Sequence, residues 1–147
     1  MALVDNSPSF RTTQYQQLSS GGEGVTAYVG AGIDGDTPVM VLQSESGYIA
    51  TALAASYNGI VGVPENGSVA TACLGLIRVK GYKAGVQASA GAFGGTAGKA
   101  IFWTAATLGG TASAYIGAAG QVAITTETLS ASTTANLWFT GIFTTAL

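Results

Sequence analysis

Acidic side chains and one cysteine are the groups in this chain whose chemistry could support catalysis or metal binding. Histidine is absent, which removes the commonest general base and the usual histidine-containing catalytic triads. The single cysteine, Cys73, therefore has no histidine to activate it, and we expect a buried, inert thiol. The acidic residues are Asp5, Glu23, Asp34, Asp36, Glu45, Glu65 and Glu127. Nearly all of them fall in predicted turns or in the N-terminal segment, so we predict that the protein is not an enzyme.

A glycine-rich segment at residues 30–35 has the G-x-G-x-x-G spacing of a dinucleotide-binding loop. That mechanism requires a helix to begin inside the loop, so that its N–H groups face the pyrophosphate. Residues 36–42 instead favour another strand. Asp34 and Asp36 could contribute to a calcium site, but no series of further oxygen ligands follows them. We therefore interpret the segment as a hairpin turn and expect neither a cofactor nor a metal.

Charged residues make up only 8% of the 147 residues, against roughly 25% in an ordinary soluble protein. The net charge is −2, and 22 glycines together with alanine, serine and threonine fill much of the remainder. Such a surface has little electrostatic repulsion, so we expect much of it to be covered in an assembly. The alternative is a monomer kept soluble by its hydroxyl groups. The small net charge predicts no binding to nucleic acid.

The chain is predicted to form short strands separated by glycine-rich turns, and these elements must position the side chains described above. Strands are predicted at residues 25–29, 37–43, 60–63, 73–88, 99–106, 111–117, 121–129 and 136–144, and residues 48–56 are either helix or strand. Turns are predicted at 44–47, at the Asn58-Gly59 hairpin signal and at 64–67. Eight or nine such strands indicate an all-β fold, either an antiparallel β-sandwich or a small β-barrel.

Residues 1–24 are polar and end in Ser19-Ser20-Gly21-Gly22, which predicts an extended N-terminal arm before a single β domain at 25–147. The first residues lack the pattern of a secretory signal, and no apolar stretch is long enough for a membrane helix. We therefore expect synthesis in a cytosol and no association with a membrane.

The strand at 73–88 is the predicted organising element and carries three of the five positive charges. Ile77 and Val79 alternate with Arg78 and Lys80, so the aliphatic and charged side chains should lie on opposite faces. A bend or bulge is expected at Gly81. The candidate docking residues are Arg78, Lys80 and Lys83, together with Arg11 from the arm. The alternative is a charged strand face that meets only solvent.

Four aromatic residues in adjacent pairs are candidates for an interface: Phe102, Trp103, Trp138 and Phe139. Neighbouring side chains on a strand point to opposite faces, so one member of each pair should leave the core of a simple sheet. This pattern favours burial on both faces, as in an oligomer. The same aromatics could instead form a platform for a carbohydrate.

Three segments between Gly67 and Phe143 share a common cadence: Arg-Val-Lys-Gly-Tyr-Lys-Ala-Gly-Val at 78–86, Lys-Ala-Ile-Phe-Trp at 99–103 and Leu-Trp-Phe-Thr-Gly-Ile at 137–142. With these segments, residues 67–143 resemble the small all-β decoration, or cement, proteins of tailed-phage heads. The scarcity of charge and the polar N-terminal arm also suit such virion proteins.

This resemblance implies a protein that is made in the host cytoplasm, binds the outer surface of a phage capsid and stabilises the head. It also implies a homotrimer, the major capsid protein as partner and no catalytic residues. Two alternatives remain open: a fibre or tail module that recognises a glycan, and, third, a small outer-membrane β-barrel.

Overall fold

The computed structural model describes residues 15–55, 57–88, 93–95, 97–110 and 119–146. Within these ranges the chain forms strands and turns without a helix, which confirms the predicted all-β class. The strands are β1 (Tyr15–Gln17), β2 (Glu23–Val29), β3 (Val39–Ser44), β4 (Gly47–Ala52), β5 (Asn58–Pro64), β6 (Cys73–Gln87), β7 (Phe93–Gly95), β8 (Ala100–Thr104), β9 (Thr107–Gly110), β10 (Gln121–Thr125), β11 (Leu129–Ser132), β12 (Thr134–Thr140) and β13 (Thr144–Thr145). In this described part, no helix is long and apolar enough to cross a membrane.

Five strands close into a small barrel, in the order β2-β4-β3-β5-β6, because β6 pairs with both β5 and β2. Along β2, the buried residues Val25, Ala27 and Val29 alternate with half-buried neighbours, as expected for one strand face turned inward. The barrel core contains Val25, Ala27, Val29, Ile33, Val39, Val41, Ala50, Ile77 and Val79. Branched aliphatic side chains therefore fill the barrel interior.

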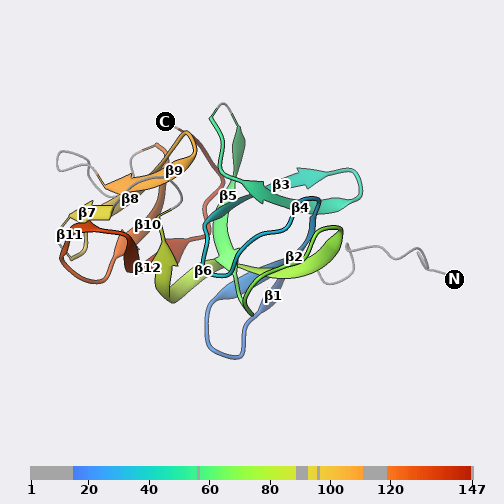
Figure 1. Ribbon diagram of the computed structural model, residues 1–147, viewed down its shortest axis with the longest axis horizontal. Coiled ribbons are helices and arrows are strands. Elements are labelled where there is room, and N and C mark those ends of the chain that lie inside the picture. Colours follow the sequence, from blue (N-terminus) through green and yellow to red (C-terminus); the bar gives the residue numbers. More distant parts are fainter. Residues whose placement is uncertain (1–14, 56, 89–92, 96, 111–118, 147) are drawn as a thin grey trace, which may run out of the picture.

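A second sheet continues from the barrel in the order β6-β12-β10-β8-β9, and the short β7–β11 ribbon lies beside it (Figure 1). Its core includes Trp103, Phe139 and Leu137, which pack in one cluster with Val61 and Val63 of β5. Those two valines belong to a barrel strand, so the outer wall of the barrel forms one side of the second core. Of the two architectures that the sequence left open, the described residues thus form a small closed barrel, and additional strands extend its sheet.

The strand β6 connects the two halves. Its first part pairs with β2, from Cys73 to Lys80, and its second part pairs with β12, from Lys80 to Gln87. Gly81 stands at the change of partner with φ of 100°, a conformation that favours glycine. The predicted strand at 73–88 is confirmed as β6, which ends at Gln87. A bend or bulge was predicted at Gly81, whereas the pairing of β6 shifts register beside it, opposite Glu23 and Gly24 and again between Lys83 and Val86.

The structure corrects two turn predictions and settles a third prediction that the sequence left open. The Asn58-Gly59 pair begins β5 and does not form a hairpin turn, because both residues pair with β13 and the next residues of β5 pair with β3. Residues 30–35 do not form a hairpin either, since β2 pairs with β4 in parallel and not with the next strand, β3. Residues 48–52 of the ambiguous segment at 48–56 belong to β4, which pairs with β3 across the predicted turn at 44–47.

Only the last part of the predicted N-terminal arm falls within the described residues. There, Tyr15–Gln17 form β1, which pairs antiparallel with the start of β2. The Tyr15 hydroxyl donates a hydrogen bond of 2.9 Å to Glu23 Oε2. Residues 1–14, with the candidate docking residue Arg11, and the strand predicted at 111–117 lie outside the described residues.

Candidate docking surface

Arg78 is the candidate docking residue whose position differs most from the prediction. Ile77 and Val79 point into the barrel, so the predicted alternation holds, and Arg78 points to the outer face of the barrel. That face is covered at this point, and only 3% of Arg78 is exposed. Residues of the β1–β2 turn and Glu65 contact the guanidinium group, so Arg78 is not available as part of an exposed docking face.

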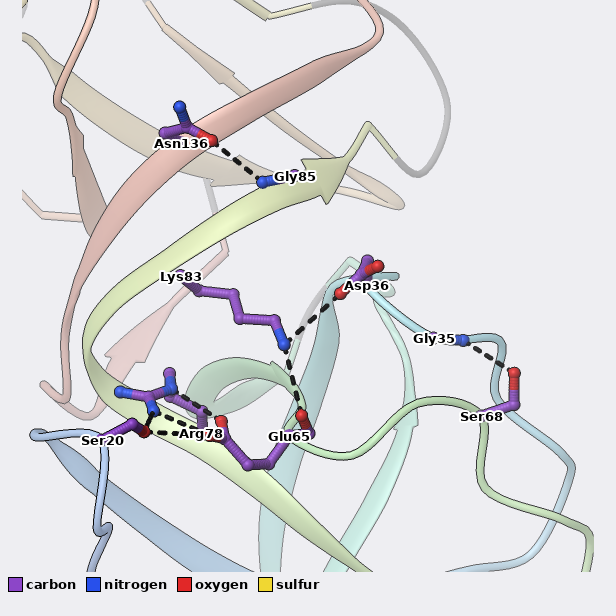
Figure 2. A network of polar contacts seen from close by, with 9 residues as sticks. All are labelled: Ser20, Gly35, Asp36, Glu65, Ser68, Arg78, Lys83, Gly85 and Asn136. Atoms are coloured by element: carbon purple, nitrogen blue, oxygen red, sulfur yellow. Dashed lines mark hydrogen bonds and ion pairs between the residues drawn. The ribbon is translucent and has the colours of Figure 1, made fainter.

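The Arg78 guanidinium binds the Glu65 carboxylate with two parallel hydrogen bonds (Figure 2). Nε donates to Oε2 at 2.7 Å and Nη2 donates to Oε1 at 2.8 Å. Nη1 also donates to the Gly21 carbonyl oxygen at 2.6 Å, and Nη2 donates to Ser20 Oγ. These hydrogen bonds from Arg78 lower the pKa of the Glu65 carboxyl against the opposing effect of burial. The arginine thus fixes the turn before β2 to the barrel.

The other two cations of β6 also have acidic partners. Lys83 Nζ lies 3.4 Å from Asp36 Oδ1 and donates to the Glu65 carbonyl oxygen at 3.3 Å, with 19% of its side chain exposed (Figure 2). Lys80 Nζ lies 3.9 Å from Glu23 Oε2 and keeps 52% of its side chain exposed. Of the three predicted docking cations, Lys80 is the one whose charge remains largely open to solvent.

Acidic clusters and surface hollows are the other features of the described residues that could mark a site. Among the described residues, no group of three or more acidic or cysteine side chains could hold a metal ion. Three hollows of about 220 to 250 Å³ lie on the surface, below the usual size of a pocket for a drug-sized ligand. Cys73, expected to be buried, is exposed, because it is the first residue of β6 and lies at the strand end.

The four predicted interface aromatics separate into three buried residues and one exposed residue. Phe102, Trp103 and Phe139 are buried, and the Trp103 indole Nε1 donates to the Ala105 carbonyl oxygen at 2.9 Å. Trp138 is 51% exposed. One member leaves the core in the pair Trp138-Phe139, as expected, whereas both members of Phe102-Trp103 are buried.

Trp138 lies beside a second exposed aromatic that the sequence did not single out. In the β6–β12 pairing, Trp138 is directly opposite Tyr82, which is 47% exposed, and Thr140 is opposite Lys80. Residues two apart on a strand share a face, so these four side chains lie together on the outer side of the sheet. We call this group (Lys80, Tyr82, Trp138 and Thr140) the Tyr82–Trp138 face. Alternation along each strand predicts which of its side chains share a face. Only the register between β6 and β12 shows that Tyr82 and Trp138 lie opposite each other.

Other large apolar side chains are also exposed. Among the described residues, those about half exposed or more are Tyr15, Tyr57, Leu74, Tyr82, Trp138, Ile142 and Phe143. Ile142 and Phe143 follow β12 after Gly141, and Ile142 lies two positions beyond Thr140 of the Tyr82–Trp138 face. Single exposed apolar residues are ordinary, so the register-matched aromatic pair is the feature that makes the Tyr82–Trp138 face the candidate contact surface.

Comparisons with protein-family models, with curated proteins and with solved structures find no match to this chain.

Proposed function

We propose that the protein is a non-enzymatic virion component that binds the outer surface of a phage capsid and stabilises the head. The observation that carries the proposal is the Tyr82–Trp138 face in a chain with 8% charged residues. Aromatic side chains supply large contact areas at protein interfaces, and a weakly charged surface favours association. The resemblance of residues 67–143 to phage decoration proteins supplies the class of partner, the major capsid protein.

In this proposal, docking depends on the aromatic pair and Lys80, and the paired cations Arg78 and Lys83 stabilise the domain. Arg78 is almost fully buried and hydrogen-bonded, so it has little capacity to recognise a partner. Lys80 is exposed and borders the aromatic pair, where it can meet an acidic group. We also propose that the protein is a homotrimer, by resemblance to the same family.

The test is a sedimentation assay that mixes the purified chain with capsids of the phage that encodes it. The double variant Tyr82→Ala/Trp138→Ala should lose most of its attachment, because truncating a tryptophan or tyrosine at the hot spot of an interface costs about 2 kcal/mol or more. The matched control is Tyr57→Ala, which removes a similarly exposed aromatic (48%) from the segment before β5. Unchanged attachment of the double variant, or no attachment of the parent chain, would contradict the proposal.

A second candidate function is recognition of a glycan by the same face. Tyr82 and Trp138 present two adjacent aromatic rings, and Lys80 and Thr140 beside them carry groups that could bind sugar hydroxyls. A glycan array distinguishes the two functions. Binding that disappears in Trp138→Ala would favour the glycan, while Trp103 is not a suitable test residue because it is fully buried.

A further inference from the structure

Two Asn-Gly dipeptides occur in this chain, Asn58-Gly59 and Asn66-Gly67, and the fold places them in opposite environments. An asparagine followed by glycine can react with its own backbone. The backbone nitrogen of the next residue attacks the side-chain carbonyl carbon, and glycine offers no side chain to hinder the approach. The reaction requires the local backbone to rotate, so secondary structure that holds the peptide should suppress it.

The first dipeptide is held inside the sheet. Asn58 and Gly59 begin β5 and pair with Thr145 and Thr144 of β13. The Asn58 side chain accepts a hydrogen bond of 2.6 Å from the Thr145 hydroxyl. Gly59 is buried, and a Cβ at this position would lie only 2.8 Å from the Val41 carbonyl oxygen. Both the amide and the backbone of this dipeptide are therefore restrained.

The second dipeptide lies in the exposed connection between β5 and β6. Asn66 and Gly67 are both exposed, and Gly67 has φ of 93° with no heavy atom within 4 Å of its Cβ position. Within the described residues, no hydrogen bond holds the Gly67 N–H. The flanking positions are anchored, since Glu65 N–H donates to the Leu76 carbonyl oxygen at 2.8 Å and the Ser68 hydroxyl accepts from Gly35 N–H at 3.0 Å. The Gly67 N–H thus has no hydrogen bond to a described residue, in a connection that is hydrogen-bonded on both sides of the dipeptide.

We propose that Asn66 is a site of spontaneous deamidation in the folded protein, while the fold protects Asn58. The Gly67 backbone nitrogen forms a bond to Asn66 Cγ, the bond from Cγ to the side-chain nitrogen breaks, and ammonia leaves with the proton. Water then opens the resulting succinimide at either carbonyl and yields aspartate or isoaspartate. Water is the only co-reactant, and nothing is oxidised or reduced.

The product adds one negative charge at a sensitive position. One added carboxylate changes the net charge from −2 to −3. The new carboxylate stands one residue after Glu65, whose carboxylate binds the buried Arg78. In the isoaspartate form the main chain also gains one methylene between two anchored positions. Deamidation would therefore alter the connection that supports the Arg78 cluster.

The experiment incubates the folded chain in mildly alkaline buffer, then digests it with a glutamate-specific protease under denaturing, mildly acidic conditions. Cleavage after Glu45, Glu65 and Glu127 gives peptide 46–65 with Asn58 and peptide 66–127 with Asn66 as their only asparagines. Mass spectrometry then measures conversion at each site. We expect Asn66 to convert about tenfold faster than Asn58 or more, because opening the strand adds to the barrier. The same incubation in concentrated urea should make the two rates similar.

Two variants assign the product. Asn66→Gln should remove the acidic species that accumulates on ion-exchange chromatography, and Asn58→Gln should leave it unchanged. Conversion at Asn58 that equals or exceeds conversion at Asn66 in the folded chain would overturn the proposal. So would an acidic species that persists in Asn66→Gln, or an Asn66 that reacts in urea and not in the folded protein.

Discussion

At the scale of single residues, the Arg78 guanidinium links three segments that are distant in sequence. We expect Arg78→Met to lower the free energy of unfolding by about 3 kcal/mol, because removing one partner of a buried ion pair leaves the other uncompensated. The loss also includes the hydrogen bonds to Gly21 and Ser20. Urea denaturation followed by circular dichroism measures the difference.

The matched control is Lys80→Met, two positions along the same strand. The Lys80 side chain is half exposed and lies 3.9 Å from Glu23, so its loss should change stability by no more than about 0.5 kcal/mol. Equal effects of the two substitutions would show that the buried pair contributes no more than a surface charge.

The ionisation of the Glu65 carboxyl should make the free energy of unfolding depend on pH. Its folded-state pKa is lowered from the ordinary 4.5, chiefly by the hydrogen bonds from Arg78. A lowered pKa contributes stability that is present above 4.5 and is lost as the pH falls through the folded-state value. Unfolding free energies measured across this acidic range should therefore fall less steeply in Glu65→Gln than in the parent chain. Parallel pH profiles would contradict this assignment.

The burial of Arg78 shows what the sequence could not provide at this scale. Alternation along residues 73–88 correctly separates Ile77 and Val79 from Arg78. It does not reveal that a turn 57 residues earlier covers the outer face, with Gly21 accepting from the guanidinium. The same limit applies to Trp103 and Trp138, which have similar local sequences but differ completely in exposure. Local pattern gives the side of a strand, and tertiary packing decides whether that side meets water.

At the scale of elements, β6 belongs to both the barrel and the second sheet, and Gly81 stands where its pairing partner changes from β2 to β12. We expect Gly81→Ala to cost about 3 kcal/mol, because alanine is strained at positive φ and its Cβ would lie 2.9 Å from Gly22 Cα. Gly85→Ala is the matched control in the same strand, since Gly85 has φ of 68° but no neighbour within 4 Å. It should cost about 1 kcal/mol, from backbone strain alone. Chemical denaturation measures the free energy of unfolding of both variants. Equal losses in the two would show that the contact with Gly22 is unimportant.

Most strands were predictable because glycine-rich turns separate the apolar segments clearly. Which strands pair with each other was harder to predict from the sequence. The parallel pair β2–β4 joins strands whose connection runs through β3, and no local signal indicates it. Asn58-Gly59 illustrates the same problem, since a dipeptide that favours a turn is held in β5 by pairing with β13, at the far end of the chain. Long-range hydrogen bonding overrides local turn preference in that case.

At the scale of the whole molecule, the two cores share β5 and β6, and this sharing should make unfolding a single transition. Val61 and Val63 belong to a barrel strand but pack in the second core, while Ile77 of β6 lies in the barrel core. Loss of either core therefore removes one wall of the other. The prediction is that circular dichroism and tryptophan fluorescence report the same midpoint in urea.

Val41→Ala tests this coupling from the barrel side. Val41 lies in β3, is buried in the barrel core and pairs with β4 and β5, so its truncation should cost about 2 kcal/mol. Both tryptophans lie outside the barrel core, with Trp103 fully buried in the second core. If the cores are coupled, the Trp103 transition shifts to lower urea by the same amount as the circular dichroism signal. A fluorescence midpoint that stays in place while circular dichroism shifts would mean that the barrel and the second sheet unfold as separate units, and that β6 joins them without coupling them.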